Sequence, residues 1–151
     1  MPRQSRAEAT RSRLLEATLA ALHERGYAGT STQEVCRRAG VSRGTLLHHF
    51  PTRNDLLIAA LDSILSDRVA RFLEAHEGTG PLPPADLVAR LWEQWQGPVY
   101  VAWLELAVAA RTEPALQAPM RAVMARFDAE MLAAFQQLVD TDGLPPAIAD
   151  A

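Results

Sequence analysis

The sequence predicts an all-α protein whose N-terminal third differs in charge from the rest. Apolar residues recur three and four positions apart along most of the 151-residue chain, and the alternating apolar and polar runs typical of strands are missing. Residues 1–53 carry a net charge of +5, from nine arginines and four glutamates, whereas residues 54–151 carry −8, from six arginines and fourteen acids. The two parts are therefore expected to have different partners.

The first predicted helix begins at Ser5 and ends at Gly26. Ser5 and Glu8 have the spacing of a capping box, in which each side chain accepts a hydrogen bond from the other residue's backbone N–H. Leu15 and Leu22 belong to one apolar stripe of helical spacing. Gly26 is placed to end the helix in the left-handed conformation, which glycine adopts without steric cost.

Two short helices are predicted next. Ser31 and Glu34 repeat the capping-box spacing, and the helix that they open ends at Gly40 after about two turns. Ser42 then caps a third helix, which runs to His49. The residues "AGV" join the two helices so tightly that we expect them to cross steeply, as in a helix-turn-helix.

A long amphipathic helix is predicted from Thr52 to about His76. Thr52 and Asp55 give a looser version of the capping box at its start. The stretch "EGTGPLPP" over residues 77–84 ends it, because glycine and proline both interrupt helices. This stretch is expected to connect the long helix to a second layer of helices.

Three further helices make up that second layer. Residues 85–96 and 99–110 each carry an apolar stripe, and Gly97 with Pro98 separates them. A seventh helix is predicted after Pro119, where apolar residues follow at spacings of four, three, four and four: Met120, Met124, Phe127, Met131 and Phe135. The last residues, "TDGLPPAIADA", are expected to form a turn and the first residues of a further helix.

The basic N-terminal part favours DNA as a partner. In a helix-turn-helix, the N-terminal residues of the second helix enter the major groove, which is wide enough to admit a helix. Four arginines lie in or beside this unit, where attraction to phosphate supplies affinity: Arg37, Arg38, Arg43 and Arg53. The sequence therefore predicts a three-helix DNA-binding domain over residues 1–53, followed by a helical domain over residues 54–151.

Residues 13–57 closely resemble the DNA-binding domain of the TetR family of bacterial transcriptional regulators. The resemblance rests on the glycine and aromatic "GY" after the first helix and on the Thr/Ser-rich start of the second. It rests further on the recognition unit "AGVSRGTLLHHF" and on "RNDLL" at the head of the fourth helix. The remaining helices have the character expected of the family's ligand-binding and dimerisation domain.

The resemblance implies a repressor that binds a palindromic operator as a homodimer and is released by a small, hydrophobic or aromatic effector. It implies DNA contacts at these positions: Thr32, Ser42, Arg43, Gly44, Thr45, His48, His49 and Arg53. Arg43 is the expected base reader, of guanine, while hydroxyls and backbone amides would hold phosphates. Leu47 departs from the family pattern, because this position is frequently a tyrosine whose hydroxyl touches phosphate.

The resemblance also implies that the second domain lacks its last helices. Family dimers form largely through two helices after the seventh, whereas this sequence stops at Ala151, where the first of them should begin. We therefore expect a homodimer in which the 151 residues are part of a longer chain. These residues alone would then leave an exposed apolar strip on the sixth and seventh helices.

Aromatic and methionine side chains of the last four helices are candidates for lining an effector pocket, because large, soft side chains suit an apolar guest. They are Phe72, Trp92, Trp95, Tyr100, Trp103, Met124 and Phe127. Ordinary core packing is the alternative interpretation, since aromatics at helical spacing usually fill a core. Regulation through protein contacts, without any effector, stays open as well.

Other classes of site are not favoured. His48 and His49 diverge by about 100° around a helix and cannot easily share one metal ion. Cys36 is expected to be a small core residue, and His23 and His76 are expected at the surface. Without a metal-ligand spacing, an apolar span or a leader, we expect no metal, no cofactor and a soluble cytoplasmic protein with no membrane contact. The alternative function is a helical enzyme or carrier that keeps the helix-turn-helix only as a structural unit.

Overall fold

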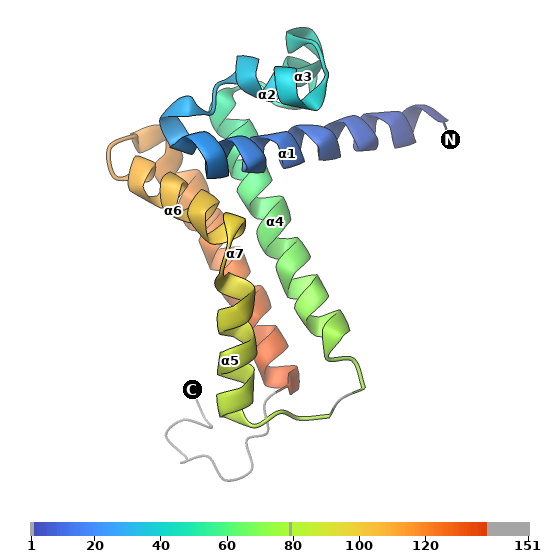
Figure 1. The fold of residues 1–151 in the computed structure, drawn as a ribbon, viewed down its shortest axis with the longest axis vertical. Coiled ribbons are helices and arrows are strands. Elements are labelled where there is room, and N and C mark those ends of the chain that lie inside the picture. The colour runs from blue at the N-terminus through green and yellow to red at the C-terminus, as the bar shows by residue number, and fades with distance from the viewer. Residues whose placement is uncertain (1, 79, 139–151) are drawn as a thin grey trace.

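The computed structural model describes residues 2–78 and 80–138, leaving out the side chains of residues 2–5, 84, 87, 91, 94 and 95. Within this part the chain has seven helices and no strand, as predicted (Figure 1). They are α1 (Pro2–Gly29), α2 (Thr32–Ala39), α3 (Arg43–His49), α4 (Arg53–Ala75), α5 (Pro84–Trp95), α6 (Pro98–Ala110) and α7 (Pro114–Leu138). None of these helices combines the length and the apolar character that crossing a membrane requires. The turn predicted over residues 141–151 lies outside the described residues.

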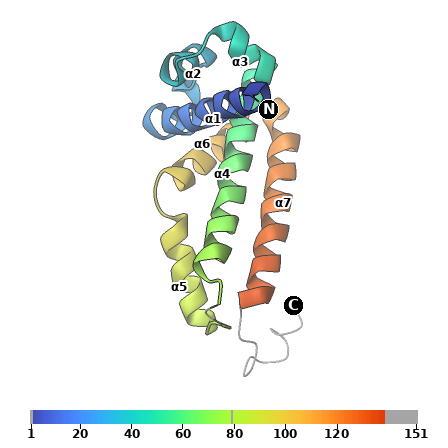
Figure 2. The same ribbon diagram turned by 90° about the vertical axis from the view of Figure 1, so that its right-hand side faces the viewer.

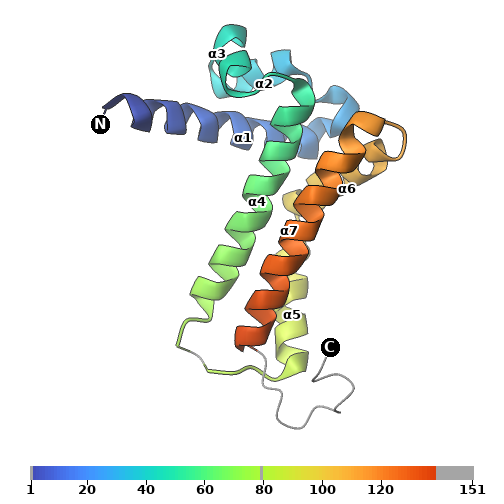
Figure 3. The ribbon, with the colours of Figure 1, turned by 180° about the vertical axis from the view of Figure 1, so that it is seen from behind.

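Helix α1 lies across one end of the longer helices. On one side of α1 lie α2 and α3, and on its other side lie α6 and α7 (Figures 1 and 3). Helix α4 joins the two sides, since it starts beside α2 and α3 and then runs alongside α7 (Figure 2). The helix-turn-helix therefore stands at one end of an elongated molecule.

The bounds of α1 differ from the prediction at both ends. The helix begins at Pro2, so Ser5 lies inside it and is not its N-cap. At Gly26 the backbone has φ 67° and ψ −177°, a conformation open essentially only to glycine, but helical structure resumes and continues to Gly29. The hydroxyl of Thr30 donates to the Gly26 carbonyl at 2.8 Å and holds this last turn in place.

The capping residues predicted for α2, α3 and α4 are confirmed. The Ser31 and Ser42 hydroxyls accept hydrogen bonds from the third backbone N–H of their helices. Thr52 forms the complete capping box with Asp55, because each side chain accepts from the backbone N–H of the other. The carboxylate of Glu34 instead faces a group of arginines, described below.

Helix α7 begins at Pro114, so the predicted start after Pro119 is wrong. A proline inside a helix removes one backbone hydrogen bond. The helix nevertheless passes through Pro119 because its apolar side chains on both sides of the proline, Leu116 and Met120, are buried. Burial of apolar surface outweighs local propensity at this point.

The two larger buried clusters meet at α4. The first joins α1, α2, α3 and the start of α4: Leu14, Leu15, Ala17, Val35, Ala39, Leu46, Phe50, Leu56 and Ala60. The second joins α4, α6 and α7 with Leu22 of α1. Leu56 belongs to the first cluster and Leu57 to the second, since adjacent helical residues point about 100° apart. The N-terminal core thus extends past Arg53, where a domain boundary is predicted from the sequence.

His76 is buried, and the expectation of a surface position is wrong. Its side chain is only 5% exposed. Its Nδ1 lies 2.7 Å from the Phe72 carbonyl oxygen, and its ring packs 4.6 Å from the Phe72 ring, measured between centroids. A polar ring is tolerated at this buried helix end because it bonds a carbonyl that the last turn of α4 leaves available.

Candidate nucleic-acid interface

Helix α3 is anchored to the molecule by one side and presents the other side to solvent. Leu46 is fully buried in the first cluster. Ser42, Arg43, Gly44, Leu47 and His48 are exposed, and Leu47 is 43% exposed despite its apolar side chain. Helix α3 lies on the opposite side of α1 from α6 and α7 (Figures 1 and 3). It is therefore accessible to a molecule as large as a DNA duplex.

The start of α3 holds its polar groups in fixed positions. The Ser42 hydroxyl accepts from the Thr45 backbone N–H at 3.1 Å and shares a 2.9 Å hydrogen bond with the Thr45 hydroxyl. Among the described residues, none forms a hydrogen bond or an ion pair with the exposed Arg43 guanidinium. An unpaired guanidinium beside a rigid helix start can reach a base edge or a phosphate.

Gly44 is not required by the fold. Its φ is not in the left-handed region, and an added Cβ would meet only the Ser42 hydroxyl, at an ordinary contact distance of 3.8 Å. Glycine inside a helix is destabilising relative to alanine. A close approach by something outside the chain would account for a glycine here.

The other predicted contact residues lie around the same end of the molecule. Thr32 is the first residue of α2 and is partly buried. The rings of His48 and His49, at the end of α3, meet edge to face at 5.6 Å between centroids. His48 is exposed and His49 is partly buried. The two rings therefore do not present one shared set of ligand atoms.

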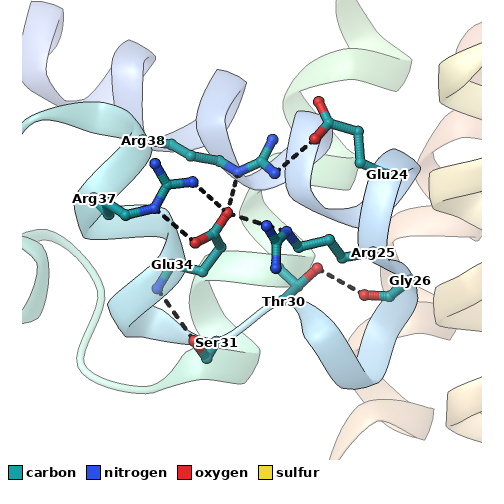
Figure 4. Close-up of polar contacts among 8 residues, drawn as sticks. All are labelled: Glu24, Arg25, Gly26, Thr30, Ser31, Glu34, Arg37 and Arg38. Atoms are coloured by element: carbon teal, nitrogen blue, oxygen red, sulfur yellow. Dashed lines mark hydrogen bonds and ion pairs between the residues drawn. The ribbon is translucent and has the colours of Figure 1, made fainter.

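The Glu34 carboxylate binds arginines from two helices (Figure 4). Arg37 donates two hydrogen bonds to its carboxylate, at 2.8 and 2.9 Å, and Arg38 donates one at 2.6 Å. Arg25 of α1 adds an ion pair at 3.3 Å. The hydrogen bonds from Arg37 and Arg38 lower the pKa of Glu34 to about 2, so the carboxylate stays ionised at neutral pH.

This cluster changes the role expected of two arginines. Arg38 also donates to Glu24 of α1 at 2.7 Å, so its guanidinium fastens α2 to α1 (Figure 4). Arg37 and Arg38 were expected to attract phosphate, but carboxylates offset much of their charge. The spacing of Glu34 to Arg37 and Arg38, three and four residues, is a signal from which the sequence could have predicted this pairing.

Arg53 is turned toward the end of α1. Its Nε donates to the Thr30 carbonyl at 2.7 Å, and a second nitrogen donates to the Tyr27 carbonyl. Its guanidinium also lies 4.1 Å above the centroid of the Tyr27 ring. These contacts hold the kinked last turn of α1 to the first turn of α4, a structural role that the sequence analysis did not anticipate.

Replacement of Arg53 by alanine is expected to lower the free energy of unfolding by about 2 kcal/mol, because two carbonyls lose a charged donor. Urea unfolding measures this change. The exposed Arg71 of α4 supplies the control, since Arg71→Ala should change stability by less than about 0.5 kcal/mol. Loss of a phosphate contact would also flatten the salt dependence of DNA binding by about one unit. Lower stability with an unchanged salt slope would leave Arg53 with a structural role alone.

The comparisons with known proteins agree with this geometry. The family described as bacterial regulatory proteins, tetR family, matches residues 14–60. An uncharacterised HTH-type transcriptional regulator of Mycobacterium tuberculosis is 32% identical over 146 residues, which make up 94% of this chain and 74% of that protein. The chain belongs to the TetR family of bacterial transcriptional regulators.

Solved structures superpose on most of the helical arrangement. A TetR-family transcriptional regulator from Rhodococcus sp. matches with a TM-score of 0.72 and 30% identity, over 86% of this chain and 71% of that one. The multidrug binding protein EbrR in complex with ethidium matches with a TM-score of 0.65 and 28% identity, over 93% of this chain and 79% of that one. TetR-family regulators are non-enzymatic DNA-binding proteins, so the alternative of a helical enzyme is wrong.

In this TetR-family chain, Tyr27 connects the DNA-binding end to α6. Its backbone N–H donates to the Glu105 carboxylate of α6 at 2.6 Å, and its hydroxyl donates to Glu113 at 2.5 Å. Burial, followed by the hydrogen bond to Glu113, raises the pKa of Tyr27. The phenol therefore remains a donor at neutral pH and ties α1 to the α6–α7 connection.

The structure distributes the residues predicted to line an effector pocket over several places. Phe127 is buried in the second cluster, and Phe72 is buried against Leu138. Trp103 donates from Nε1 to the Met124 sulfur at 3.2 Å, and both residues line an open surface depression of about 320 Å³ between α6 and α7. Trp92 and Tyr100 are 68% and 43% exposed, whereas the Trp95 side chain lies outside the described part. One pocket lined by all seven residues stays a prediction.

The remaining candidates bear no sign of a reactive centre. Cys36 packs partly buried against the first cluster, and burial raises the pKa of its thiol. No group of three His, Cys, Asp or Glu residues in the described part of the chain could hold a metal ion.

Proposed function

We propose that this TetR-family chain is a repressor that binds a palindromic operator as a homodimer and releases it when a small molecule binds the helical domain. The observation that carries the proposal is the start of α3, where the exposed and unpaired Arg43 stands next to a glycine that the fold does not require. Such a regulator works in the cytoplasm, where bacterial DNA is found.

The proposed DNA contacts are those expected from the sequence. They are Thr32, Ser42, Arg43, Gly44, Thr45, His48, His49 and Arg53. Arg43 reads a base edge, because a guanidinium can donate two parallel hydrogen bonds to guanine O6 and N7. The absence of a side chain at Gly44 lets the start of α3 approach the duplex. The exposed Leu47 offers apolar contact where a tyrosine would offer a hydroxyl.

Homodimer formation is supported by exposed apolar side chains on α6 and α7. Leu104 and Val108 of α6 are 42% and 55% exposed, and Leu132 of α7 is 52% exposed. A palindromic operator requires two α3 helices about one turn of DNA apart, roughly 34 Å, or a multiple of that spacing. A two-fold contact between chains through α6 and α7 would cover these side chains and place two recognition helices symmetrically.

A small-molecule effector is supported by the helical half of the chain. EbrR, which shares this arrangement of helices, is described as a multidrug binding protein and was solved with ethidium. In the present chain Trp103 and Met124 line an open surface depression between α6 and α7, and α6 is tied to α1 through Glu105 and Tyr27. A molecule that shifts α6 would therefore act on the end of the molecule that carries α3.

Replacement of Arg43 by alanine is expected to weaken binding to a palindromic site by about 1 to 3 kcal/mol and to relax the preference at one base pair per half-site. The site is first selected from random DNA with the purified protein, and titrations of fluorescent duplexes then measure affinity for each single-base variant. Arg37→Ala is the control, because Arg37 is bonded to Glu34 and should cause a smaller loss with no change in base preference.

Two results would contradict the proposed reading of DNA. If Arg43→Ala weakened binding equally on every DNA sequence, Arg43 would contact phosphate and not a base edge. If the wild-type protein selected no symmetric site from random DNA, the proposal of a palindromic operator would be wrong, whatever the effect of the variants.

A further inference from the structure

We propose that the cleft between α4 and α5 binds a small organic oxyanion, a carboxylate or a phosphate ester, through Arg68 and Arg90. The inference rests on the proposed function, because it names a chemical class of effector for the helical half of the chain. It adds a second, charged region to the apolar one expected from the sequence.

The cleft has the size of a ligand site and a basic lining. Its volume is about 380 Å³, within the range of small-molecule sites, roughly 300 to 1,000 Å³. The lining consists of Arg68, Ala75, His76, Arg90, Glu93 and Gln96. Two arginines against one glutamate leave a net positive charge. Apart from Ala75, these residues are polar or charged, unlike the apolar lining that the sequence predicts for an effector pocket.

Arg68 is the strongest indication of a missing anion. Its Nη1 is buried from solvent and has no hydrogen-bond partner among the residues that the structure describes. Burial, followed by the nearby charge of Arg71, lowers the pKa of Arg68. Burying a cationic N–H without an acceptor is costly, and an oxyanion in the cleft would offset this cost by binding the accessible part of the Arg68 guanidinium.

Arg90 is held in position on the opposite helix. Its Nη1 lies 3.1 Å from His76 Nε2, and His76 Nδ1 lies 2.7 Å from the Phe72 carbonyl oxygen. Since a guanidinium only donates, Nε2 accepts this bond and Nδ1 donates to the carbonyl. The buried His76 thus orients Arg90 toward the cleft from α5, while Arg68 faces it from α4.

Glu93 does not neutralise the two arginines. It lines the same cleft, yet no ion pair joins Arg68 or Arg90 to Glu93 or to any other described carboxylate. A guanidinium pair without a carboxylate partner matches the oxygens of a carboxylate or phosphate group. Glu93 can accept hydrogen bonds from polar groups on the rest of the ligand, and Gln96 can accept or donate them.

The test is calorimetric titration of the 151-residue protein with benzoate, phenyl phosphate and the neutral benzamide. We expect the two anions to bind and benzamide not to, and the preferred anion separates a carboxylate from a phosphate ligand. Arg68→Met and Arg90→Met should each weaken anion binding about tenfold or more. The exposed Arg71→Met, three residues from Arg68 on α4, should leave binding within about twofold of the wild type.

Thermal unfolding without ligand separates a binding role from a structural one. Arg68→Met should unfold at the same or a higher temperature than the wild type, because a partly buried cation without a partner among the described residues is removed. Lower stability of Arg68→Met, together with unchanged anion binding by Arg90→Met, would overturn the inference. Failure of both anions to bind a wild-type protein that still binds its selected DNA site would also overturn it, and would leave the proposed repressor intact. Arginine-dependent anion binding by a protein that binds no DNA would support the cleft and refute the repressor.

Discussion

Replacing Leu46 by alanine is expected to lower the free energy of unfolding by about 2 to 5 kcal/mol and to abolish specific DNA binding. Leu46 is the fully buried residue of the seven-residue α3 and packs in the cluster that joins α1, α2 and the start of α4. The truncation leaves a cavity in a small core, where few neighbours can collapse into it. Such a loss is a large part of the stability of a domain of this size.

The adjacent leucine provides the matched control for that experiment. Leu47 is 43% exposed, so Leu47→Ala should change the free energy of unfolding by less than about 0.5 kcal/mol. Urea unfolding of both variants, followed by circular dichroism, gives the comparison. Equal losses in the two variants would mean that α3 is not anchored through Leu46, and the described orientation of the recognition helix would be wrong.

Replacing Gly26 by alanine is expected to destabilise the protein by about 1 to 3 kcal/mol, since φ 67° with ψ −177° is open essentially only to glycine. An added Cβ would also lie 2.7 Å from the Glu105 carboxylate, which accepts the Tyr27 N–H. The substitution therefore strains the backbone and displaces the contact between α1 and α6. A change in DNA affinity should accompany the loss of stability.

Two further variants help to interpret the Gly26→Ala result. One is a control at another glycine, and the other removes the Glu105 carboxylate so that the steric effect can be separated from the backbone strain. Gly44→Ala should leave stability unchanged or slightly higher, because its added Cβ meets only an ordinary contact inside a helix. In a Glu105→Ala background the steric part of the Gly26→Ala effect disappears, whereas the backbone part remains. A Gly26→Ala protein as stable as the wild type would show that the kink in α1 is not a fixed feature of the fold.

The capping residues show why much of this fold could be predicted. Ser31, Ser42 and Thr52 bond backbone groups three residues away, so both partners of each contact lie within one short stretch of sequence. The error at Pro119 has the opposite origin. Local propensity argues for a helix that starts after the proline, but burial of the apolar face against distant helices extends α7 through it.

The candidate DNA interface likewise contains features that local sequence predicts and contacts that it does not predict. The exposed start of α3 follows from a local pattern, and the family relationship makes that pattern specific. Arg53 was expected to contact phosphate, but its hydrogen-bond partners are carbonyls 23 and 26 residues earlier in the chain. Arg38 likewise finds Glu24, fourteen residues away, on another helix. No spacing rule in the sequence identifies such partners.

The sequence by itself determined the order of the helices, the caps of α2, α3 and α4, and the family, because each of these depends on side chains within a few residues of one another. Only the tertiary structure decided that Arg38 and Arg53 bind oxygens of α1 and of the residue that follows it, whereas Arg43 has no partner among the described residues. It alone brought Tyr27 to Glu105 across 78 residues, and Arg68 and Arg90 to the two sides of one cleft. The physical reason is that a guanidinium binds whichever oxygens folding brings near it, and packing of the helices sets those neighbours.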